Sequence, residues 1–384
     1  MILRIVGRHV RAPRSRQSAV ILRPMSSPPS AHIEREHQTL LLPTGHQVAW
    51  AEYGPSDGLP LFAFHGFPSS RFEFGAMAKV AEKKGIRLIC PDRPGFGLSA
   101  LRSVPTAQNP QSQMELPRIV DYPNTVLALA DHLSLPRFAV AGFSGGGPFA
   151  VACAASLPTD RLVSAGIVAS GGPWIDSRQS PSVNTSIPSD DTINAADLQR
   201  HVMWIPYLFS SAVYRAPAVT SWVLGFLVGG IKRLLQSHAV QRRAESWMLD
   251  QWKKANKGES DAEERERIGK AREMVTRTIL EAFRQGADGA VHEARLLSSD
   301  WGIDFGGIKE SVGLRIWHGS KDANAPINQI RYLAQRIPGA VLTEYDQNHF
   351  GVGAHIEEIL EELTGPLREQ EQGSDTYDRG IIIE

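Results

Sequence analysis

Short segments rich in β-branched and aromatic residues alternate with segments of helical periodicity along the first half of the chain. This alternation restricts the fold more than any other feature, because parallel strands need a helical crossover between them. The sequence therefore predicts an α/β architecture, with a mostly parallel sheet and helices on both faces. The predicted strands are 46–53, 59–64, 86–90, 137–143 and 162–170, and the predicted helices among them are 72–84 and 146–157.

The alternation stops at about residue 174 and returns after residue 300. The intervening periodicity is helical, so we expect a helical cap, residues 176–300, inserted into a core of residues 36–175 and 301–366. Such an insertion is expected to cover the crevice at the carboxyl ends of the strands. The remaining predicted elements are cap helices at 198–215, 219–236, 240–254 and 261–285, strands at 314–317 and 341–345, and a closing helix at 353–364.

The two ends of the chain differ from the core. Residues 1–35 form a basic leader with no acidic residue before Glu34, which resembles a mitochondrial transit peptide and predicts a mitochondrial location. Two alternatives stay open, a disordered basic tail and a true start at Met25, and both are compatible with a cytoplasmic location. The segment 367–384 is polar and is predicted to be disordered. The arginines of the leader are Arg4, Arg8, Arg11, Arg14, Arg16 and Arg23.

The composition argues against several function classes. The 41 basic and 41 acidic residues leave a formal net charge of zero, which removes the bulk electrostatic case for a nucleic-acid partner. No segment reaches the roughly 20 apolar residues of a membrane span, and the nearest, 216–231, is interrupted by glycines. Cys90 and Cys153 are too few for a disulfide framework or a multi-cysteine metal site, and are predicted to be buried free thiols. We expect no metal and no cofactor, and the oligomeric state stays open.

A Gly-x-Ser-x-Gly pentapeptide, residues 142–146, joins a predicted strand directly to a predicted helix. The pentapeptide alone occurs easily by chance, so its position carries the argument. A strand-to-helix turn this sharp holds the serine in a strained conformation with its hydroxyl above the sheet. Gly142 and Gly146 are required because a Cβ there would collide across the turn. Ser144 is therefore the predicted nucleophile, and the alternatives are a helix N-cap serine or a phosphate-binding loop.

Backbone donors for a developing oxyanion are expected from two loops. The N–H of Gly145 lies at the positive end of the predicted helix. His65-Gly66-Phe67-Pro68 follows the predicted strand 59–64 and offers the N–H of Phe67 as the second donor. Each such donor contributes on the order of 3 kcal/mol to the transition state. The alternative for His-Gly is an ordinary turn.

A serine hydroxyl needs a base to take its proton and a carboxylate to orient that base. The predicted base is His349, in the loop between the last predicted strand and the closing helix, whereas His355 falls inside that helix. The predicted acid is Asp322, which follows the strand at 314–317, and its rival is Asp176 in the loop after an earlier strand. A surface histidine and a turn aspartate are the alternatives for the predicted pair.

Four motifs carry a family resemblance: His65-Gly66-Phe67-Pro68, the stretch 91–99 (PDRPGFGLS), the pentapeptide 142–146, and 317–322 (WHGSKD). Together they resemble the α/β-hydrolase family, in particular its cap-bearing esterase, epoxide-hydrolase and peptidase-like branch. The resemblance covers residues 38–175 and 286–365. It is specific for the fold and not for a substrate.

The resemblance implies the same roles for Ser144, Asp322 and His349 as nucleophile, acid and base. It also implies Phe67 and Gly145 as oxyanion donors. In the stretch 91–99, Asp92 and Arg93 are expected to brace the loop without taking part in the chemistry.

One departure from the family narrows the expected reaction. Epoxide hydrolases commonly have the His-Gly-Phe-Pro loop, but they place aspartate where this chain has Ser144, and their activating tyrosines cannot be assigned in the cap. We therefore expect a cofactor-independent serine hydrolase that cleaves an ester or related acyl bond through an acyl-enzyme intermediate. Thioester, C–C bond or peptide hydrolysis by the same residues stays open, as does a non-catalytic ligand receptor.

Aromatic residues in the cap indicate an apolar pocket for a medium-sized acyl substrate. Trp222 and Phe226 are the predicted substrate-binding residues, with Trp204, Tyr207 and Phe209 as further candidates. Aromatic residues at helical spacing also pack as core, which is the alternative for this group.

Overall fold

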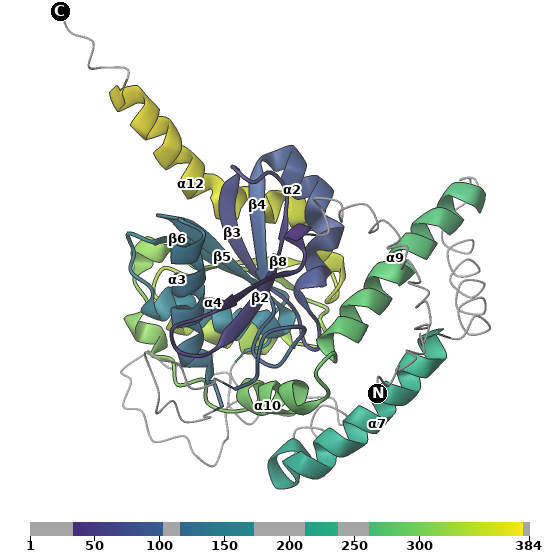
Figure 1. Ribbon diagram of the computed structural model, residues 1–384. Helices are drawn as coiled ribbons and strands as arrows, with labels where there is room; N and C mark the ends of the chain where they lie inside the picture. Colours follow the sequence, from purple (N-terminus) through teal and green to yellow (C-terminus); the bar gives the residue numbers. More distant parts are fainter. Residues whose placement is uncertain (1–33, 103–115, 173–211, 237–260, 379–384) are drawn as a thin grey trace, which may run out of the picture.

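Eight strands form one sheet in the computed structural model, which describes residues 34–102, 116–172, 212–236 and 261–378. Their order is β1-β2-β4-β3-β5-β6-β7-β8, and Figure 1 shows the sheet at the centre of the molecule with helices around it. Both pairs that involve β2 are antiparallel, and every neighbouring pair from β4 to β8 is parallel. The strands are β1 (Gln38–Leu41), β2 (Gln47–Tyr53), β3 (Leu59–Phe64), β4 (Ile86–Pro91), β5 (Phe138–Phe143), β6 (Leu162–Val168), β7 (Arg315–Gly319) and β8 (Val341–Tyr345).

Helices cover both faces of the sheet. Successive side chains of a strand point to opposite faces, and in β5 Phe138 and Val140 belong to one buried cluster while Ala139 and Ala141 belong to another. The first cluster includes side chains of α3, α4 and α11, and the second includes side chains of α2 and α12. The predicted fold class is confirmed. The helices are α2 (Ala78–Lys84), α3 (Tyr122–His132), α4 (Gly147–Ser156), α11 (Ile327–Arg336) and α12 (Ile356–Asp378).

All seven predicted strands are present, with ends within two residues of the prediction. β1 was not predicted, because this short edge strand alternates between half-buried and exposed residues and has no strong apolar pattern. The helices α3, α10 (Asp288–Leu297) and α11 were not predicted either. The predicted helix at 72–84 consists of a 3₁₀ segment, η1 (Arg71–Met77), followed by α2.

The closing helix is longer than the sequence predicts. A short 3₁₀ segment, η6 (Gly351–His355), precedes α12, and α12 continues to Asp378. The expectation of disorder from residue 367 is therefore wrong as far as Asp378. Leu360, Leu363 and Leu367 are buried in one cluster, so the apolar face continues past Pro366. Its packing outweighs the cost of an internal proline, about 3 kcal/mol.

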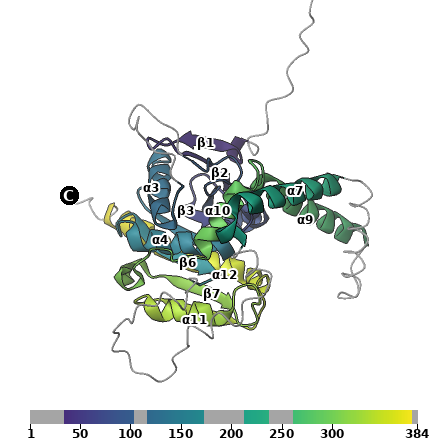
Figure 2. The same ribbon diagram turned by 90° about the horizontal axis from the view of Figure 1, so that it is seen from below.

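The predicted cap contributes three helices to the described residues: α7 (Pro217–Gln236), α9 (Asp261–Ala282) and α10 (Asp288–Leu297). α9 packs on η1, and α7 packs on α10. Figures 1 and 2 show α7 and α9 projecting from the same side of the sheet. The predicted helix at 240–254 and most of that at 198–215 lie outside the described residues, as does the leader to residue 33, whose targeting role stays a prediction. Within the described ranges, no helix combines the length and the apolar character needed to cross a membrane.

The sheet order places a crevice between the carboxyl ends of β3 and β5. β4 lies on one side of β3 and β5 on the other, so the loops that follow β3 and β5 diverge at this point. Ligands bind at such a switch point in open α/β sheets. The predicted site residues follow β3, β5, β7 and β8, whose carboxyl ends share one edge because these strands are parallel.

Candidate active site

Ser144 lies at the sharp turn between β5 and α4, as the sequence predicts. Its φ is +50°, in the left-handed region that side chains rarely adopt and that is often found at functional sites. The residue opens a single 3₁₀ turn, η3 (Ser144–Gly146), and α4 begins immediately afterwards. This geometry is that of a nucleophile elbow.

The glycines of the pentapeptide are required for steric reasons. A Cβ on Gly142 would lie 2.4 Å from the carbonyl oxygen of Gly146. A Cβ on Gly146 would lie 2.3 Å from the carbonyl oxygen of Phe64, the last residue of β3. Any larger residue therefore forces backbone apart, which confirms the expected collision. The same contacts hold the elbow against the end of β3.

The loop after β3 lies against the elbow. A Cβ on Gly145 would be 3.1 Å from the amide nitrogen of Phe67, and a Cβ on Gly66 would be 3.5 Å from the Cβ of Ser144. The backbone amides of Phe67 and Gly145 are thus close neighbours beside Ser144. This is the arrangement that the prediction of two oxyanion donors requires.

Buried polar groups fix the conformation of this loop. Burial, and next the charge of Arg93, holds the pKa of His65 well below its usual value, so its imidazole is neutral. Its Nε2 accepts the N–H of Arg93 at 3.1 Å, and its Nδ1–H consequently donates to the carbonyl oxygen of Gly66 at 2.9 Å. The guanidinium of Arg93 donates to the carbonyl oxygens of His65 and Gly66. Arg93 braces the loop, as predicted.

Asp322 and His349 come together after the last two strands. The Nδ1 of His349 lies 2.7 Å from the Oδ2 of Asp322, whose side chain is fully buried, while that of His349 is 14% exposed. The Oδ1 of Asp322 accepts the N–H groups of Asn324 and Ala325 at 2.8 and 2.9 Å. Burial alone raises the pKa of Asp322, but hydrogen bonds from His349 and Ala325 lower it below its usual value. An ionised Asp322 orients the ring so that Nε2 of His349 is free to exchange a proton.

Comparison with known proteins agrees with this architecture. A family model described as the alpha/beta hydrolase fold matches residues 60–201. The crystal structure of the enol-lactonase from Burkholderia xenovorans LB400 has a TM-score of 0.51 at 17% identity, and the match covers 86% of this chain and 100% of that one. This chain is an α/β-hydrolase-fold protein. At such low identity the structural likeness concerns the fold alone.

Two curated proteins are similar in sequence to part of this hydrolase-fold chain, and their names describe different activities. Lipase 1 from Psychrobacter immobilis is 34% identical over 139 residues, which are 36% of this chain and 40% of the lipase. The dihydrolipoyllysine-residue acetyltransferase component of an acetoin cleaving system from Pseudomonas putida is 32% identical over 130 residues, which are 33% of this chain and 31% of that protein. The chain thus spans less than half the length of either relative.

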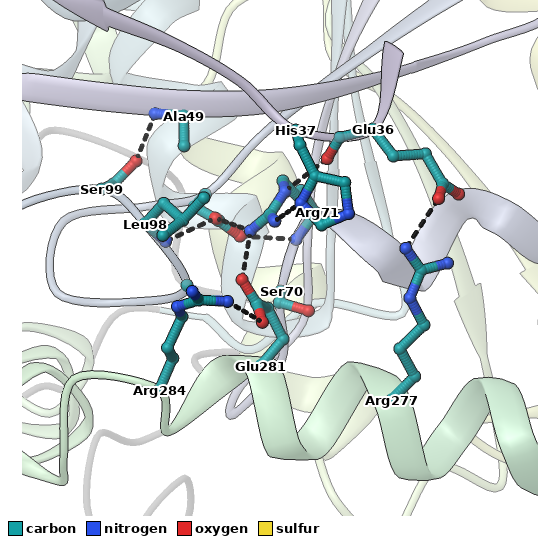
Figure 3. Close-up of polar contacts among 12 residues, drawn as sticks. Glu36, His37, Ala49, Ser70, Arg71, Leu98, Ser99, Arg277, Glu281 and Arg284 are labelled. Atoms are coloured by element: carbon teal, nitrogen blue, oxygen red, sulfur yellow. Dashed lines mark hydrogen bonds and ion pairs between the residues drawn. The ribbon is translucent and has the colours of Figure 1, made fainter. Parts of the chain in front are cut away.

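A buried charge cluster around Arg71 joins the hydrolase-fold core to α9 (Figure 3). The guanidinium of Arg71 is fully buried and pairs with Asp92 at 2.6 Å and with Glu281 of α9 at 2.8 Å. It also donates to the carbonyl oxygen of Glu36 at 2.7 Å. Asp92 accepts the N–H of Leu98 as well, so it braces its loop as predicted. Arg71 was missed by the sequence analysis, because nothing in its local sequence distinguishes it from a surface arginine.

A second site residue that the sequence analysis missed is Glu73 in η1. Its Oε2 accepts the N–H of Gly66 at 2.8 Å, so a carboxyl group reaches the loop beside Ser144. A single glutamate in a predicted helix carries no sequence signal for such a role.

The predicted substrate-binding side chains of α7 are largely exposed to solvent. Trp222 and Phe226 stack on each other with ring centroids 6.3 Å apart, and they are 73% and 74% exposed. Leu224 and Val228, on another face of α7, pack in a small cluster that also contains Phe67. Substrate binding by Trp222 and Phe226 stays a prediction.

The remaining candidates are placed as follows. His355 stacks on Tyr345 at 3.8 Å and does not pair with Asp322. Asp176 lies outside the described residues, as do Trp204, Tyr207 and Phe209. Both cysteines are free and buried, as predicted. No cluster of three or more His, Cys, Asp or Glu side chains suited to a metal ion occurs in the ranges that the structure describes.

Proposed function

We propose that this protein is a serine hydrolase that cleaves a carboxylic ester or a related acyl bond. Ser144 Oγ attacks the acyl carbon while Nε2 of His349 takes its proton, and Asp322 stabilises the imidazolium that forms. The N–H groups of Phe67 and Gly145 bind the developing oxyanion. His349 then protonates the leaving group, and water activated by the same imidazole releases the acyl group from Ser144.

The observation that carries this proposal is the strained Ser144 beside the neighbouring backbone amides of Phe67 and Gly145. A helix N-cap serine has extended backbone angles and needs no such strain, whereas Ser144 has a φ of +50°. Ser134 shares the left-handed backbone after α3, so the strain at Ser144 matters because Ser144 stands on the turn between β5 and α4, at the carboxyl edge of the sheet. The pair of Asp322 and His349 on the same edge of the sheet supplies a base with a fixed tautomer.

The acyl bond is favoured over the alternatives by simple chemistry. A half-buried serine elbow with two N–H donors is complementary to a tetrahedral oxyanion, which ester, thioester and amide cleavage all form. Among these, esters and thioesters have better leaving groups than amides and need less assistance at that step. The names of the lipase and enol-lactonase relatives agree with ester or lactone chemistry. A receptor that binds without turnover would not need the carboxylate behind His349.

Replacing Ser144 by alanine tests the proposal directly. We expect kcat on a hydrolysed p-nitrophenyl ester to fall by about 10⁴-fold or more, because the covalent step is lost. Labelling by a fluorophosphonate probe should be lost as well. Ser134→Ala is the matched control, since Ser134 also has a left-handed φ of +55° but follows α3. Equal turnover by wild type and Ser144→Ala, or a wild type that neither labels nor hydrolyses any acyl ester, would reject the assignment.

A substrate panel then separates the bond types. Acyl esters and thioesters of increasing chain length, with peptide and C–C substrates beside them, are compared by kcat/KM. We expect esters of apolar acyl groups to have the highest kcat/KM, since Phe67, whose N–H is the proposed oxyanion donor, packs with Leu224 and Val228 against one apolar cluster. A higher kcat/KM on peptides or vinylogous diketones would move the assignment to one of the alternatives.

A further inference from the structure

Glu73 contacts the loop after β3, residues 65–68, which we call the oxyanion loop. It does so from an element that the proposed reaction does not use. It lies in η1, after the loop that follows β3, and its Oε2 accepts the N–H of Gly66 at 2.8 Å. The side chain of Ser69 also hydrogen-bonds this carboxyl. Two donors from one loop thus hold the carboxyl in place.

The carboxyl of Glu73 and the nucleophile occupy the same side of Gly66. A Cβ on Gly66 would lie 3.4 Å and 3.6 Å from the two carboxyl oxygens and 3.5 Å from the Cβ of Ser144. Gly66 separates these groups only because it has no side chain. Its N–H is committed to Glu73, which leaves the next amide, that of Phe67, for an oxyanion.

Charged and titratable groups face Glu73 from three loops or strands. They are Arg93 after β4, His349 after β8, and the buried thiol of Cys90 at the end of β4. The guanidinium of Arg93 is already committed to Glu293 and to the carbonyl oxygens of His65 and Gly66. Arg93 therefore acts on Glu73 at a distance, and His349 is the group whose charge changes during the proposed reaction.

Burial raises the pKa of Glu73 above its ordinary value of 4.5, while the hydrogen bonds from Ser69 and Gly66 oppose this rise. The positive charges of Arg93 and of a protonated His349 also oppose it. Glu73 consequently changes charge at a higher pH than a surface glutamate does.

We propose that Glu73 is a positioning residue for the hydrolysis proposed above, holding the Gly66 amide so that the Phe67 donor faces the oxyanion and placing a negative charge beside the imidazolium of His349. The inference rests on the proposed function. A hydrogen bond to an ionised carboxylate is roughly twice as strong as one to a neutral group. The assistance is therefore greatest above the pKa of Glu73 and declines as pH falls through it.

Two substitutions separate charge from hydrogen bonding. Glu73→Gln keeps an acceptor for the Gly66 N–H but carries no charge, and Glu73→Leu removes both. We expect kcat/KM of Glu73→Gln to be about tenfold below wild type at a pH above the pKa of Glu73. The deficit should shrink towards unity as pH falls below the pKa of Glu73. Glu73→Leu should lose about 100-fold in kcat above the pKa of Glu73 and stay impaired below it, with KM little changed, since the loop acts on the transition state.

Glu82→Gln in α2 is the control, because Glu82 is exposed and lies outside the site. Thermal unfolding of each variant identifies any loss of fold, and Glu73→Gln carries the test if Glu73→Leu fails to fold. The inference is overturned if the ratio of wild-type kcat/KM to that of Glu73→Gln stays constant from pH 4.5 to 9. It is also overturned if Glu73→Leu keeps the wild-type kcat. If the wild type hydrolyses esters and the Ser144→Ala variant does not, either of these results refutes only the role of Glu73 and leaves the proposed function intact. A wild type without turnover or probe labelling refutes the proposed function and this inference with it.

Discussion

The carboxyl edge of the sheet and the cap helix α7 are built in opposite ways. At the edge, a Cβ on Gly142 or Gly146 would come within 2.4 Å of backbone oxygen. In α7, Gly225, Gly229 and Gly230 have no atom within 4 Å of the corresponding position. The edge thus specifies its residues by direct backbone contact, whereas α7 leaves most of its surface open.

This difference explains why short motifs reveal the fold and not the substrate. Where backbones touch, only a few residue types fit, so the sequence carries a readable signature. On an open helix many side chains are compatible with the same packing, and the sequence says little about what the helix contacts. The chemistry is encoded where the packing is tightest.

The helix α10 connects the two regions. A Cβ on Gly289 of α10 would lie 2.4 Å from the carbonyl oxygen of Gly95 in the loop after β4. Close by, the guanidinium of Arg93 pairs with Glu293 of α10, and both side chains are almost completely buried. By residue number, these α10 residues belong to the predicted cap. Their contacts, however, are with the loop after β4 at the carboxyl edge of the sheet, and we call this contact the α10 joint.

The largest effect is expected from breaking the ion pair at this joint. Glu293→Gln leaves the charge of Arg93 buried without its counter-charge, which should lower the free energy of unfolding by about 3–5 kcal/mol. Arg277→Gln is the matched control, because it removes the 2.6 Å contact between Arg277 and Glu36, a half-exposed pair that contributes at most about 1 kcal/mol. Urea denaturation measures both. Similar losses of unfolding free energy in the two variants would mean that the buried Arg93–Glu293 pair contributes no more to stability than the more exposed Arg277–Glu36 pair.

A smaller effect is expected from adding one methyl group to a glycine in each region. Gly146→Ala forces a Cβ against the carbonyl oxygen of Phe64 and should cost about 3 kcal/mol, together with most of the activity. Gly229→Ala meets open space inside α7 and should stabilise the protein by up to about 1 kcal/mol, because alanine is the better helix former. Urea midpoints and ester turnover are the measurements. A tolerated Gly146→Ala would show that the elbow can relax.

The smallest effect is expected from truncating apolar residues of α7. Leu224→Ala removes a side chain that packs near Phe67, so it should change kcat/KM for long acyl esters by about tenfold, corresponding to 1–2 kcal/mol of lost apolar contact. Trp222→Ala removes an exposed ring and should leave stability within about 0.5 kcal/mol. If Trp222→Ala changes kcat/KM more than Leu224→Ala does, Trp222 contacts the substrate as the sequence predicts, and Leu224 does not have the larger role.

Most of the core fold was predictable from the sequence. Seven strands appear where their apolar patterns predict them. β1 has no strong apolar pattern, whereas α3, α10 and α11 were not predicted although α11 is amphipathic and buries Ile330 and Leu333. The extension of α12 was hidden by Pro366, because a proline signals a helix end locally and only the buried Leu367 reveals that packing continues.

The candidate site was predictable to the extent that its residues follow strand ends. Ser144, Asp322, His349 and Phe67 could be placed from the sequence, since parallel strands bring their carboxyl ends to one edge. Arg71, Glu73 and Glu293 could not. Arg71 meets Glu281 across 210 residues and Arg93 meets Glu293 across 200, and Glu73 meets Gly66 after the chain folds back.

By itself, the sequence determined the layer order, the elbow and the identity of the proposed reacting groups, because local steric rules and strand periodicity depend on neighbouring residues. Only the tertiary structure decided what braces the oxyanion loop, which face of α7 approaches Phe67, and how α9 and α10 attach to the core. These features depend on side chains that are distant in the chain. These side chains find their partners because opposite charges and apolar surfaces are buried together in the folded protein. A local sequence pattern contains no information about such contacts.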